Sequence, residues 1–535
     1  MLVTSTLSTF TRRARAFLSP DASPTLILLL CAAMSLGIYI LAFTRLSFLP
    51  DVWNVPLKSG AQISLRTIDS GAGLARFQLV TGFAALGVLY FFAYRAAKQA
   101  KTRLDTAVVV TAAAGFGFVL LFMYPFGAAD IFDNITHGRM IAFYDANPFQ
   151  QVANDFRSDP FLPYAAWRTS RSAYGPLWEL MAGVTARLAG SALVTNILAF
   201  KLLPGLFWVL TLIVAWVMLR RAGARPALPG FLLLAWNPLI LYEVWGNGHN
   251  DMAMAFFVLL AAWTMLEQRY TLAVVSLVAG ALIKYMPLLL IPLAGLIALR
   301  ALPTWRRRIL FAASAAVVSL ALIVVTFQPF WVGPQTLTIG RRATMLSGSI
   351  GSALHSILVD GPPKLDKEDT AKSITTGLAA LTAAAALFAA WRGQRRPTWQ
   401  SFVHHSFGIF MFYLLVTVPW FQQWYAIWPL VLLPFLDAPA RSLALVFGFA
   451  VLGKQLWVDP ALFWSRRWTP LPSREIGFAL GNLAISWLYA LFLAREPIRR
   501  AARALSHPLR RLRPRSRPTP ALIPVTGKDD HPDRE

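Results

Sequence analysis

The sequence predicts an all-α polytopic membrane protein whose external loops carry short amphipathic helices. Apolar residues make up 56% of the 535 residues and charged residues only 14%, whereas a soluble chain of this length needs more charge to cover its surface. The 19 Trp and 37 Phe residues are typical of a chain that meets lipid and its interfaces. Apolar runs long enough to cross a bilayer recur along the whole chain.

Each predicted span is an apolar run that can cross the bilayer, or a shorter one that can lie buried among other helices. The runs are 26–44, 77–94, 106–124, 202–219, 227–242, 252–266, 309–330, 373–391, 407–420, 424–436, 442–458 and 476–494. The longer run 271–299 contains Lys284 and Pro287, so we expect a hairpin of two short helices with Lys284 near its turn. The total is about 12–14 membrane-spanning helices.

Lysine and arginine predict the orientation. Basic connectors occupy 95–103, 220–225, 306–308 and 392–396, and both terminal segments are basic. By the positive-inside rule we place them in the cytoplasm, in a multi-pass protein of the plasma (inner) membrane. This pattern accounts for the net charge of +25, so we expect no nucleic acid among the partners.

Three parts follow from this orientation. We expect a basic cytoplasmic N-terminus over 1–24, a transmembrane domain over 25–495 and a basic, disordered cytoplasmic tail over 496–535.

The long loops 125–201 and 331–372 then lie outside, and most Asp and Glu residues lie on that side. Carboxylates weigh little in topology, so this bias suggests an external function. Within the first loop, 176–193 has a helical apolar stripe and is expected to lie flat on the outer interface.

The first polar group follows the third span. Asp130, Asp133 and His137 are spaced i, i+3 and i+7, so a helix would place all three on one face; Arg139 follows. Capping of a helix start is the simpler role, above all for Asp133. A carboxylate at a membrane boundary is otherwise costly unless it is used or paired.

Further polar groups end other predicted spans. Tyr174 lies in SAYGPLWE, which alone reads as a turn, and WNPLILYEVWGNGHND ends in His249, Asn250 and Asp251. Turning explains the Gly and Asn residues there, but not His249 and Asp251, which can bind a sugar hydroxyl, a phosphate, a cation or each other. Lys284 inside an apolar run either snorkels to the interface or meets an anion.

The last group pairs Arg341 and Arg342 with FQQWYAIWP, which contains Gln423, Trp424 and Tyr425. Two arginines beside a membrane can hold a phosphate through several N–H donors. The aromatic residues form either an interfacial belt or a surface on which a sugar ring stacks.

Together these groups suit an anionic, lipid-linked substrate and a hydroxyl acceptor. The metal ligand, if there is one, is Asp130 or Asp251, and carboxylates suit Mg or Mn. No ligand set is close enough in sequence to require a metal.

These motifs resemble a known superfamily by their order. An Asp after an early span, YGPL, WNPL…GNGHND and G-A-L-x-K-x-x-P are similar to the polytopic glycosyltransferases of the GT-C type. The likeness is greatest to bacterial polyprenol-phosphate-mannose-dependent alpha-1,6-mannopyranosyltransferases, with the GT87 group similar in the same places. It covers 105–300 by motif and 300–495 only by the pattern of spans.

The resemblance implies a sugar donor carried on polyprenyl phosphate, a glycan or lipid-linked acceptor, surrounding membrane lipids, and reaction on the extracytoplasmic face. The family's general base falls on Asp130, while Asp133 departs from the pattern and leaves that assignment open. Attack by the acceptor oxygen on the anomeric carbon, from the face opposite the phosphate, would invert the configuration of that carbon. Lys284, Arg341 and Arg342 are candidates to stabilise the leaving phosphate, with His249 as a hydrogen-bond donor.

A transporter or a lipid or glycan flippase is the rival class, since it also combines many spans with a polar cavity. Transporters place charges near the bilayer midplane, whereas most charges here lie at external ends of spans. Mannose is implied by the resemblance alone, and glucose or a pentose stays open.

Overall fold

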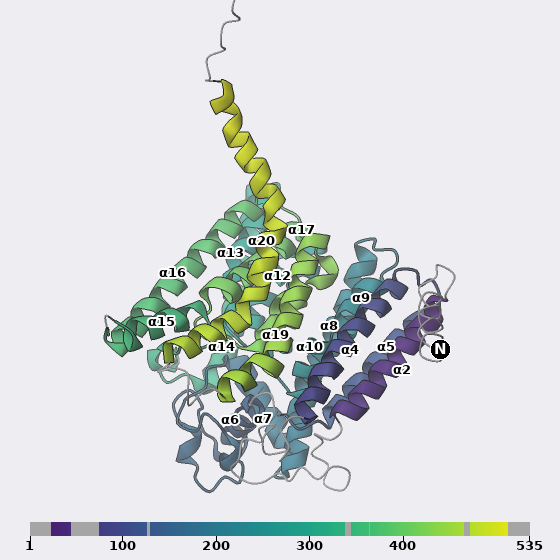
Figure 1. The fold of residues 1–535 in the computed structure, drawn as a ribbon. Coiled ribbons are helices and arrows are strands. Elements are labelled where there is room, and N and C mark those ends of the chain that lie inside the picture. The colour runs from purple at the N-terminus through teal and green to yellow at the C-terminus, as the bar shows by residue number, and fades with distance from the viewer. Residues whose placement is uncertain are drawn as a thin grey trace, which may run out of the picture. The chain divides into compact units, whose positions relative to one another are not determined.

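The structure is a computed structural model that describes residues 23–43, 74–125, 129–337, 344–362, 364–464 and 471–511. Within these ranges every regular element is a helix (Figure 1), so the chain is an all-α polytopic membrane protein. The chain divides into two compact units, one that ends at Trp487 and a second from Leu488 to Glu535. The first unit carries all the polar groups singled out from the sequence.

Seven helices of the described residues are long and apolar enough to cross a membrane, or eight if one bent pair counts as a span. They are α2 (Pro24–Phe43), α4 (Leu74–Ala97), α5 (Arg103–Leu121), α8 (Leu193–Arg221), α14 (Trp305–Phe327), α16 (Lys367–Gly393) and α20 (Leu471–Arg511). Polar connectors cap several of them: the hydroxyl of Thr102 and the carboxylate of Asp105 form a capping box at α5.

Shorter helices occupy most of the other predicted spans. They are α9 (Leu228–Ala235), α10 (Pro238–Leu241), α11 (Asp251–Leu266), α12 (Tyr270–Ala281), α13 (Ile291–Ala301), α17 (Trp399–Phe412) and α18 (Ile427–Leu430), while the 27-residue α19 (Ala438–Trp464) covers the run 442–458. Three more, α6 (Asp130–Tyr144), α7 (Pro176–Ala189) and α15 (Ile350–Asp360), lie in the two loops predicted to be external. The prediction of short helices in these loops is confirmed.

Two predicted spans are irregular because proline interrupts them. The run 227–242 breaks at Asn237–Pro238 and bends by 42°, with the Asn237 side chain capping α10. The prediction of a regular span over 424–436 is wrong: the segment is a chain of short turns around α18, with Pro429 and Pro434 inside it.

The run 271–299 is interrupted as predicted. Helix α12 ends at Ala281, a short turn carries Lys284, and the chain resumes through Met286–Leu290 into α13. Helix α12 contacts both later segments.

Two helices are longer than their apolar runs. Helix α8 begins at Leu193 rather than 202. Its Lys201 is fully buried and donates from Nζ to the carbonyl oxygens of Leu120, Leu121 and Met123. The lysine thereby satisfies carbonyls at the end of α5 that have no helical partner.

Helix α20 continues through Arg511, so residues 496–511 of the expected tail are helical. Residues 1–22 and 512–535 of the two predicted terminal segments lie outside the described ranges.

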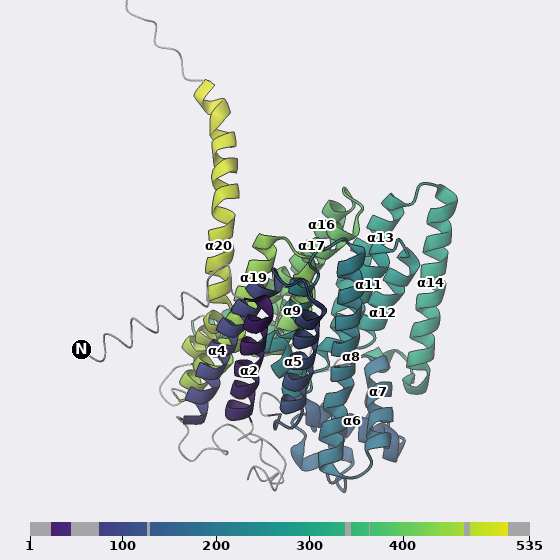
Figure 2. The same cartoon turned by 90° about the vertical axis from the view of Figure 1, so that its right-hand side faces the viewer.

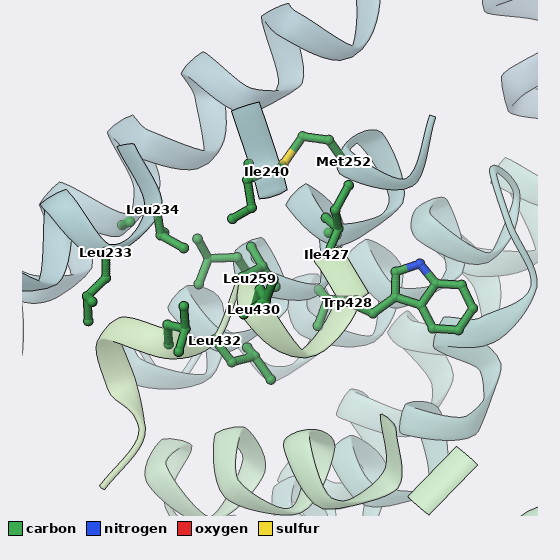
Figure 3. Packing of buried hydrophobic residues seen from close by; sticks show 14 of the residues in the cluster. Leu233, Leu234, Ile240, Met252, Leu259, Ile427, Trp428, Leu430 and Leu432 are labelled. Atoms are coloured by element: carbon green, nitrogen blue, oxygen red, sulfur yellow. The ribbon is translucent and has the colours of Figure 1, made fainter. Parts of the chain in front are cut away.

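The largest hydrophobic cluster packs the irregular segments against α11. Figure 3 shows Leu233, Leu234, Ile240, Met252, Leu259, Ile427, Trp428, Leu430 and Leu432 meeting there. Each of these side chains is at most 1% exposed, so the broken segments are packed into the interior in the same way as regular helices.

Helices α6 and α7 form a layer at one end of the first unit, as both views show (Figures 1 and 2). Their close contact depends on glycine. A Cβ on Gly138 would overlap the carbonyl of Ala182, and one on Gly183 would lie 2.8 Å from Ile141. Helix α7 ends at Ala189, with Gly190 as its C-cap, and is therefore separate from α8, which begins at Leu193.

We expect Gly138→Ala to destabilise the protein by roughly 1–3 kcal/mol, because the added methyl group must push α6 away from α7. The measurement is the midpoint of thermal unfolding of the purified protein in detergent. Gly377→Ala in α16 is the control, since nothing lies within 4 Å of its Cβ position. Equal midpoints for both variants would contradict the close packing of α6 on α7.

Candidate active site

A cavity of about 320 Å³ opens beside α6, and segments far apart in the sequence line it. Its walls come from α6, the segment 167–174, the turn that carries Lys284, and the segment 413–428. The lining residues are Asp130, Asp133, His137, Trp167, Ala173, Tyr174, Lys284, Tyr285, Met286, Met345, Tyr413, Pro419, Trp420, Gln422, Trp424, Tyr425 and Trp428.

Helix α6 presents its acidic face to this cavity. Asp130, Asp133 and His137 all line it, so the prediction of one helical face is confirmed. The two aspartates differ in their surroundings. Asp133 is 5% exposed and accepts the backbone N–H of Trp167 at 2.8 Å, whereas Asp130 is half-buried and its Oδ2 lies 3.4 Å from the Tyr174 hydroxyl. Asp133 therefore ties the loop to α6, and Asp130 is the more accessible carboxylate.

A buried glutamate orients His137. The Nδ1 atom of His137 lies 3.3 Å from Oε1 of Glu179, which is 0% exposed, and the Ser172 hydroxyl donates to the same oxygen. A carboxylate on one ring nitrogen fixes the orientation of an imidazole. Sequence reasoning missed Glu179 as a functional residue, although a carboxylate on the apolar stripe of α7 was a usable signal.

Lys284 lies at the cavity wall, and the buried carboxylate of Asp251 holds its ammonium in place. Nζ is 2.8 and 3.0 Å from the two carboxylate oxygens of Asp251, and Trp428 Nε1 donates to Oδ1 of that carboxylate at 2.6 Å. The ammonium also lies 4.6 Å from the ring centre of Tyr425 and 5.9 Å from that of Tyr174. These aromatic faces attract the cation.

The other polar residues of the GNGHND segment form a layer behind this wall. His249, Asn250 and Asp251 are at most 2% exposed, and none of them lines the cavity. The His249 ring stacks on Trp424 with 4.0 Å between ring centres, and its Nδ1 lies 2.9 Å from Glu243. The structure thus places these three predicted residues behind the cavity wall, where the His249 ring backs Trp424 and the Asp251 carboxylate holds the Lys284 ammonium.

Arg139 is also turned away from the cavity. Its Nε lies 2.9 Å from Asp159, and its guanidinium lies 4.3 Å from the ring centre of Phe161. Both members of the ion pair are buried, so Arg139, a candidate for substrate or phosphate binding in the sequence, lies away from the cavity with its charge already paired. The partner follows 20 residues later in an irregular segment, which helical spacing does not reveal.

The remaining candidates divide between the cavity wall and other places. Tyr174, Trp424 and Tyr425 line the cavity. Gln423 is 5% exposed and does not line it, whereas its neighbour Gln422 does. Arg341 and Arg342 lie outside the described residues.

Tyr285 also lines the cavity and was not anticipated from the sequence. Its hydroxyl donates to the Tyr174 carbonyl at 3.3 Å.

The described residues do not fit a metal ion held by protein side chains alone, because no three His, Cys, Asp or Glu residues among them converge on one point. Asp251 is already occupied by Lys284, and Asp130 supplies one carboxylate.

Known proteins resemble this chain over its first half. The family model described as "Alpha-(1->6)-mannopyranosyltransferase, N-terminal domain" matches residues 29–300. The chain belongs to this family. The match contains Asp130, His137, Asp251 and Lys284, whereas the aromatic wall from Trp420 to Trp428 comes from beyond it.

A curated relative agrees with the family. Alpha-(1->6)-mannopyranosyltransferase A of Corynebacterium glutamicum is 24% identical over 226 residues. The alignment covers 39% of this chain and 45% of the relative, so the chain spans less than half the length of that mannosyltransferase.

We expect Arg139→Gln to destabilise the protein by about 3–5 kcal/mol, because it leaves the Asp159 carboxylate buried without a countercharge. The double variant Arg139→Gln/Asp159→Asn should recover part of the loss, since a neutral pair replaces the ion pair. Thermal unfolding in detergent measures all three proteins. If the double variant were no more stable than Arg139→Gln, the structural role of this pair would be disproved.

Proposed function

We propose that this protein is a membrane glycosyltransferase that moves a sugar, most simply mannose, from a polyprenyl-phosphate donor to a hydroxyl of a glycan or lipid-linked acceptor on the extracytoplasmic face. One observation carries the proposal: a single cavity contains the accessible carboxylate of Asp130 and the anchored ammonium of Lys284. Tyr174 lies near both: its hydroxyl is 3.4 Å from Oδ2 of Asp130, and its ring centre is 5.9 Å from the Lys284 ammonium. Membership of the mannopyranosyltransferase family supports the choice of sugar.

Asp130 acts as the general base. Its carboxylate takes the proton from the acceptor hydroxyl while that oxygen attacks the anomeric carbon from the face opposite the phosphate. The C–O bond to the phosphate breaks, the electron pair leaves with the polyprenyl phosphate, and the anomeric configuration inverts. Asp130 is preferred to Asp133 because Asp133 is nearly buried and already binds a backbone N–H.

Lys284 stabilises the departing phosphate. The side chain of Lys284 is 15% exposed while that of Asp251 is fully buried, so the ammonium is the part of the pair that a substrate can reach. A cation fixed in advance costs no reorganisation as charge develops on the leaving group. Arg341 and Arg342 remain proposed as further phosphate ligands, on the strength of the sequence alone.

His137 and the aromatic residues hold the sugar. Glu179 fixes the His137 ring at the cavity wall, where the imidazole can hydrogen-bond a hydroxyl or a phosphate oxygen. Trp167 and Trp420 meet edge to face at 5.4 Å, and Trp424 is backed by the His249 ring. Rigid rings of this kind suit the apolar face of a sugar at little entropic cost.

Transport or flipping of a lipid-linked glycan is the competing function. Such a protein needs no general base, and it leaves the glycosidic bond of its cargo intact. Formation of a new glycosidic bond by the purified protein therefore separates the two functions.

We expect Asp130→Asn to lower the transfer rate roughly a hundred- to ten-thousandfold, the usual contribution of a general base. The assay follows radiolabelled mannose from polyprenyl-phosphate mannose into glycan in membranes that contain the protein. Asp133→Asn serves as the paired variant, and we expect it to reduce the amount of folded protein more than the rate per folded molecule. Full transfer by Asp130→Asn would disprove its role, and loss of transfer only in Asp133→Asn would move the role to that residue.

We expect Lys284→Gln to lower kcat roughly a hundredfold or more, as loss of one preorganised donor to a developing anion does. Because this variant also leaves Asp251 unpaired, Lys284→Gln/Asp251→Asn is the informative protein: folding should recover while kcat stays low. Recovery of kcat together with folding would show that Lys284 serves the fold alone.

A further inference from the structure

A second cavity lies between α4 and α19, which pack against each other. It has a volume of about 480 Å³. Its lining is almost entirely apolar and consists of Gly87, Tyr90, Phe91, Tyr94, Leu233, Leu445, Val446, Phe449, Ala450 and Ile485. We refer to it as the α4–α19 groove.

The walls of the groove offer little to a polar ligand. Its two polar side chains are tyrosines, and both hydroxyls are engaged: Tyr90 donates to the Leu233 carbonyl at 2.8 Å, and Tyr94 accepts from Nη1 of Arg441 at 3.1 Å. The groove therefore suits an aliphatic chain.

One end of the groove is cationic. Lys98 and Arg95 are exposed. Nζ of Lys98 lies 4.7 Å from the ring centre of Tyr94, and the guanidinium of Arg95 lies 5.9 Å from that of Phe91. Both rings are part of the groove wall. Among the described residues no carboxylate forms an ion pair with either cation or with Arg441.

The groove is distinct from the candidate active site. Its cationic mouth is at the end of α4, just before α5 begins at Arg103, whereas Asp130 follows the other end of α5. The 19 residues of α5 separate these two ends by about 28 Å. The mouth also belongs to the basic connector 95–103, which the positive-inside rule places in the cytoplasm.

From this combination we infer that the α4–α19 groove binds an anionic phospholipid of the cytoplasmic leaflet. One acyl chain fills the apolar groove, and the phosphate lies between Arg95 and Lys98. Basic side chains beside a membrane attract anionic headgroups, and the open end of the groove fixes where that headgroup sits. The polyprenyl-phosphate donor is not the occupant, because its sugar must reach the cavity beside Asp130.

The experiment uses the purified full chain in detergent with dioleoyl-phosphatidylglycerol or dioleoyl-phosphatidylcholine, and native mass spectrometry counts the bound lipids. We expect the wild-type protein to hold one phosphatidylglycerol in preference to phosphatidylcholine. Arg95→Gln/Lys98→Gln should weaken that binding roughly tenfold or more, since each basic side chain near a headgroup contributes about 1 kcal/mol. Arg306→Gln/Arg307→Gln carries the same charge change on exposed residues at the start of α14 and should leave the binding unchanged.

A second variant tests the apolar part. Ala450→Phe places a ring in the groove and should abolish the tight phosphatidylglycerol adduct, whereas Ala316→Phe on the exposed face of α14 should not. Because lipid binding is measured without sugar transfer, the result does not depend on the proposed activity.

Three results would overturn the inference. The first is equal retention of the two phospholipids by the wild-type protein. The second is unchanged phosphatidylglycerol binding in both variants, Ala450→Phe and Arg95→Gln/Lys98→Gln. The third is displacement of phosphatidylglycerol by equimolar polyprenyl phosphate, which would assign the groove to the isoprenoid.

Discussion

The ion pair between Asp251 and Lys284 is the interaction on which the cavity depends. It joins the start of α11 to the turn after α12, and the Trp428 indole, 177 residues away from Asp251, donates to the same carboxylate. Burying either charge without its partner would destabilise the fold, because the cost of removing the charge from water would not be offset by attraction to an opposite charge. The three segments must therefore come together, and when they do, the ammonium of Lys284 is held at the wall of the cavity.

Backbone hydrogen bonds extend this constraint to the acidic helix. The N–H groups of Gly175 and Leu177 donate to the carbonyls of Ile283 and Leu282 at 2.9 Å, so the start of α7 is docked on the turn that carries Lys284. A Cβ on Gly175 would overlap the Leu282 carbonyl, which explains glycine at this position. Because α7 in turn packs closely on α6, the acidic face and the lysine are fixed relative to each other by the main chain.

Composition and periodicity were enough to predict the long helices and the shared face of Asp130, Asp133 and His137, because both depend on neighbours within a few residues. Side chains paired across long distances in sequence were not predictable in the same way. Arg139 and Asp251 look like exposed ligands in the sequence, yet each is buried against a partner from a remote or irregular segment. The bends at Asn237 and through Pro429 were not predicted, because hydropathy indicates only that a segment is buried. A buried turn is as apolar as a buried helix, so the two look alike in the sequence.

The anchoring of Lys284 also bears on how the proposed reaction ends. A lone ammonium in a low-dielectric site would bind the phosphate of the polyprenyl product tightly and slow its release. Asp251 neutralises much of that charge from behind, and the ring faces of Tyr425 and Trp428 hold the cation in place without adding a full charge. The ammonium is then fixed for the moment at which the leaving oxygen gains charge, while its attraction for the resting phosphate is moderated. Catalysis depends on stabilising the transition state more than the bound ground state, and a buried countercharge behind the ammonium favours that difference.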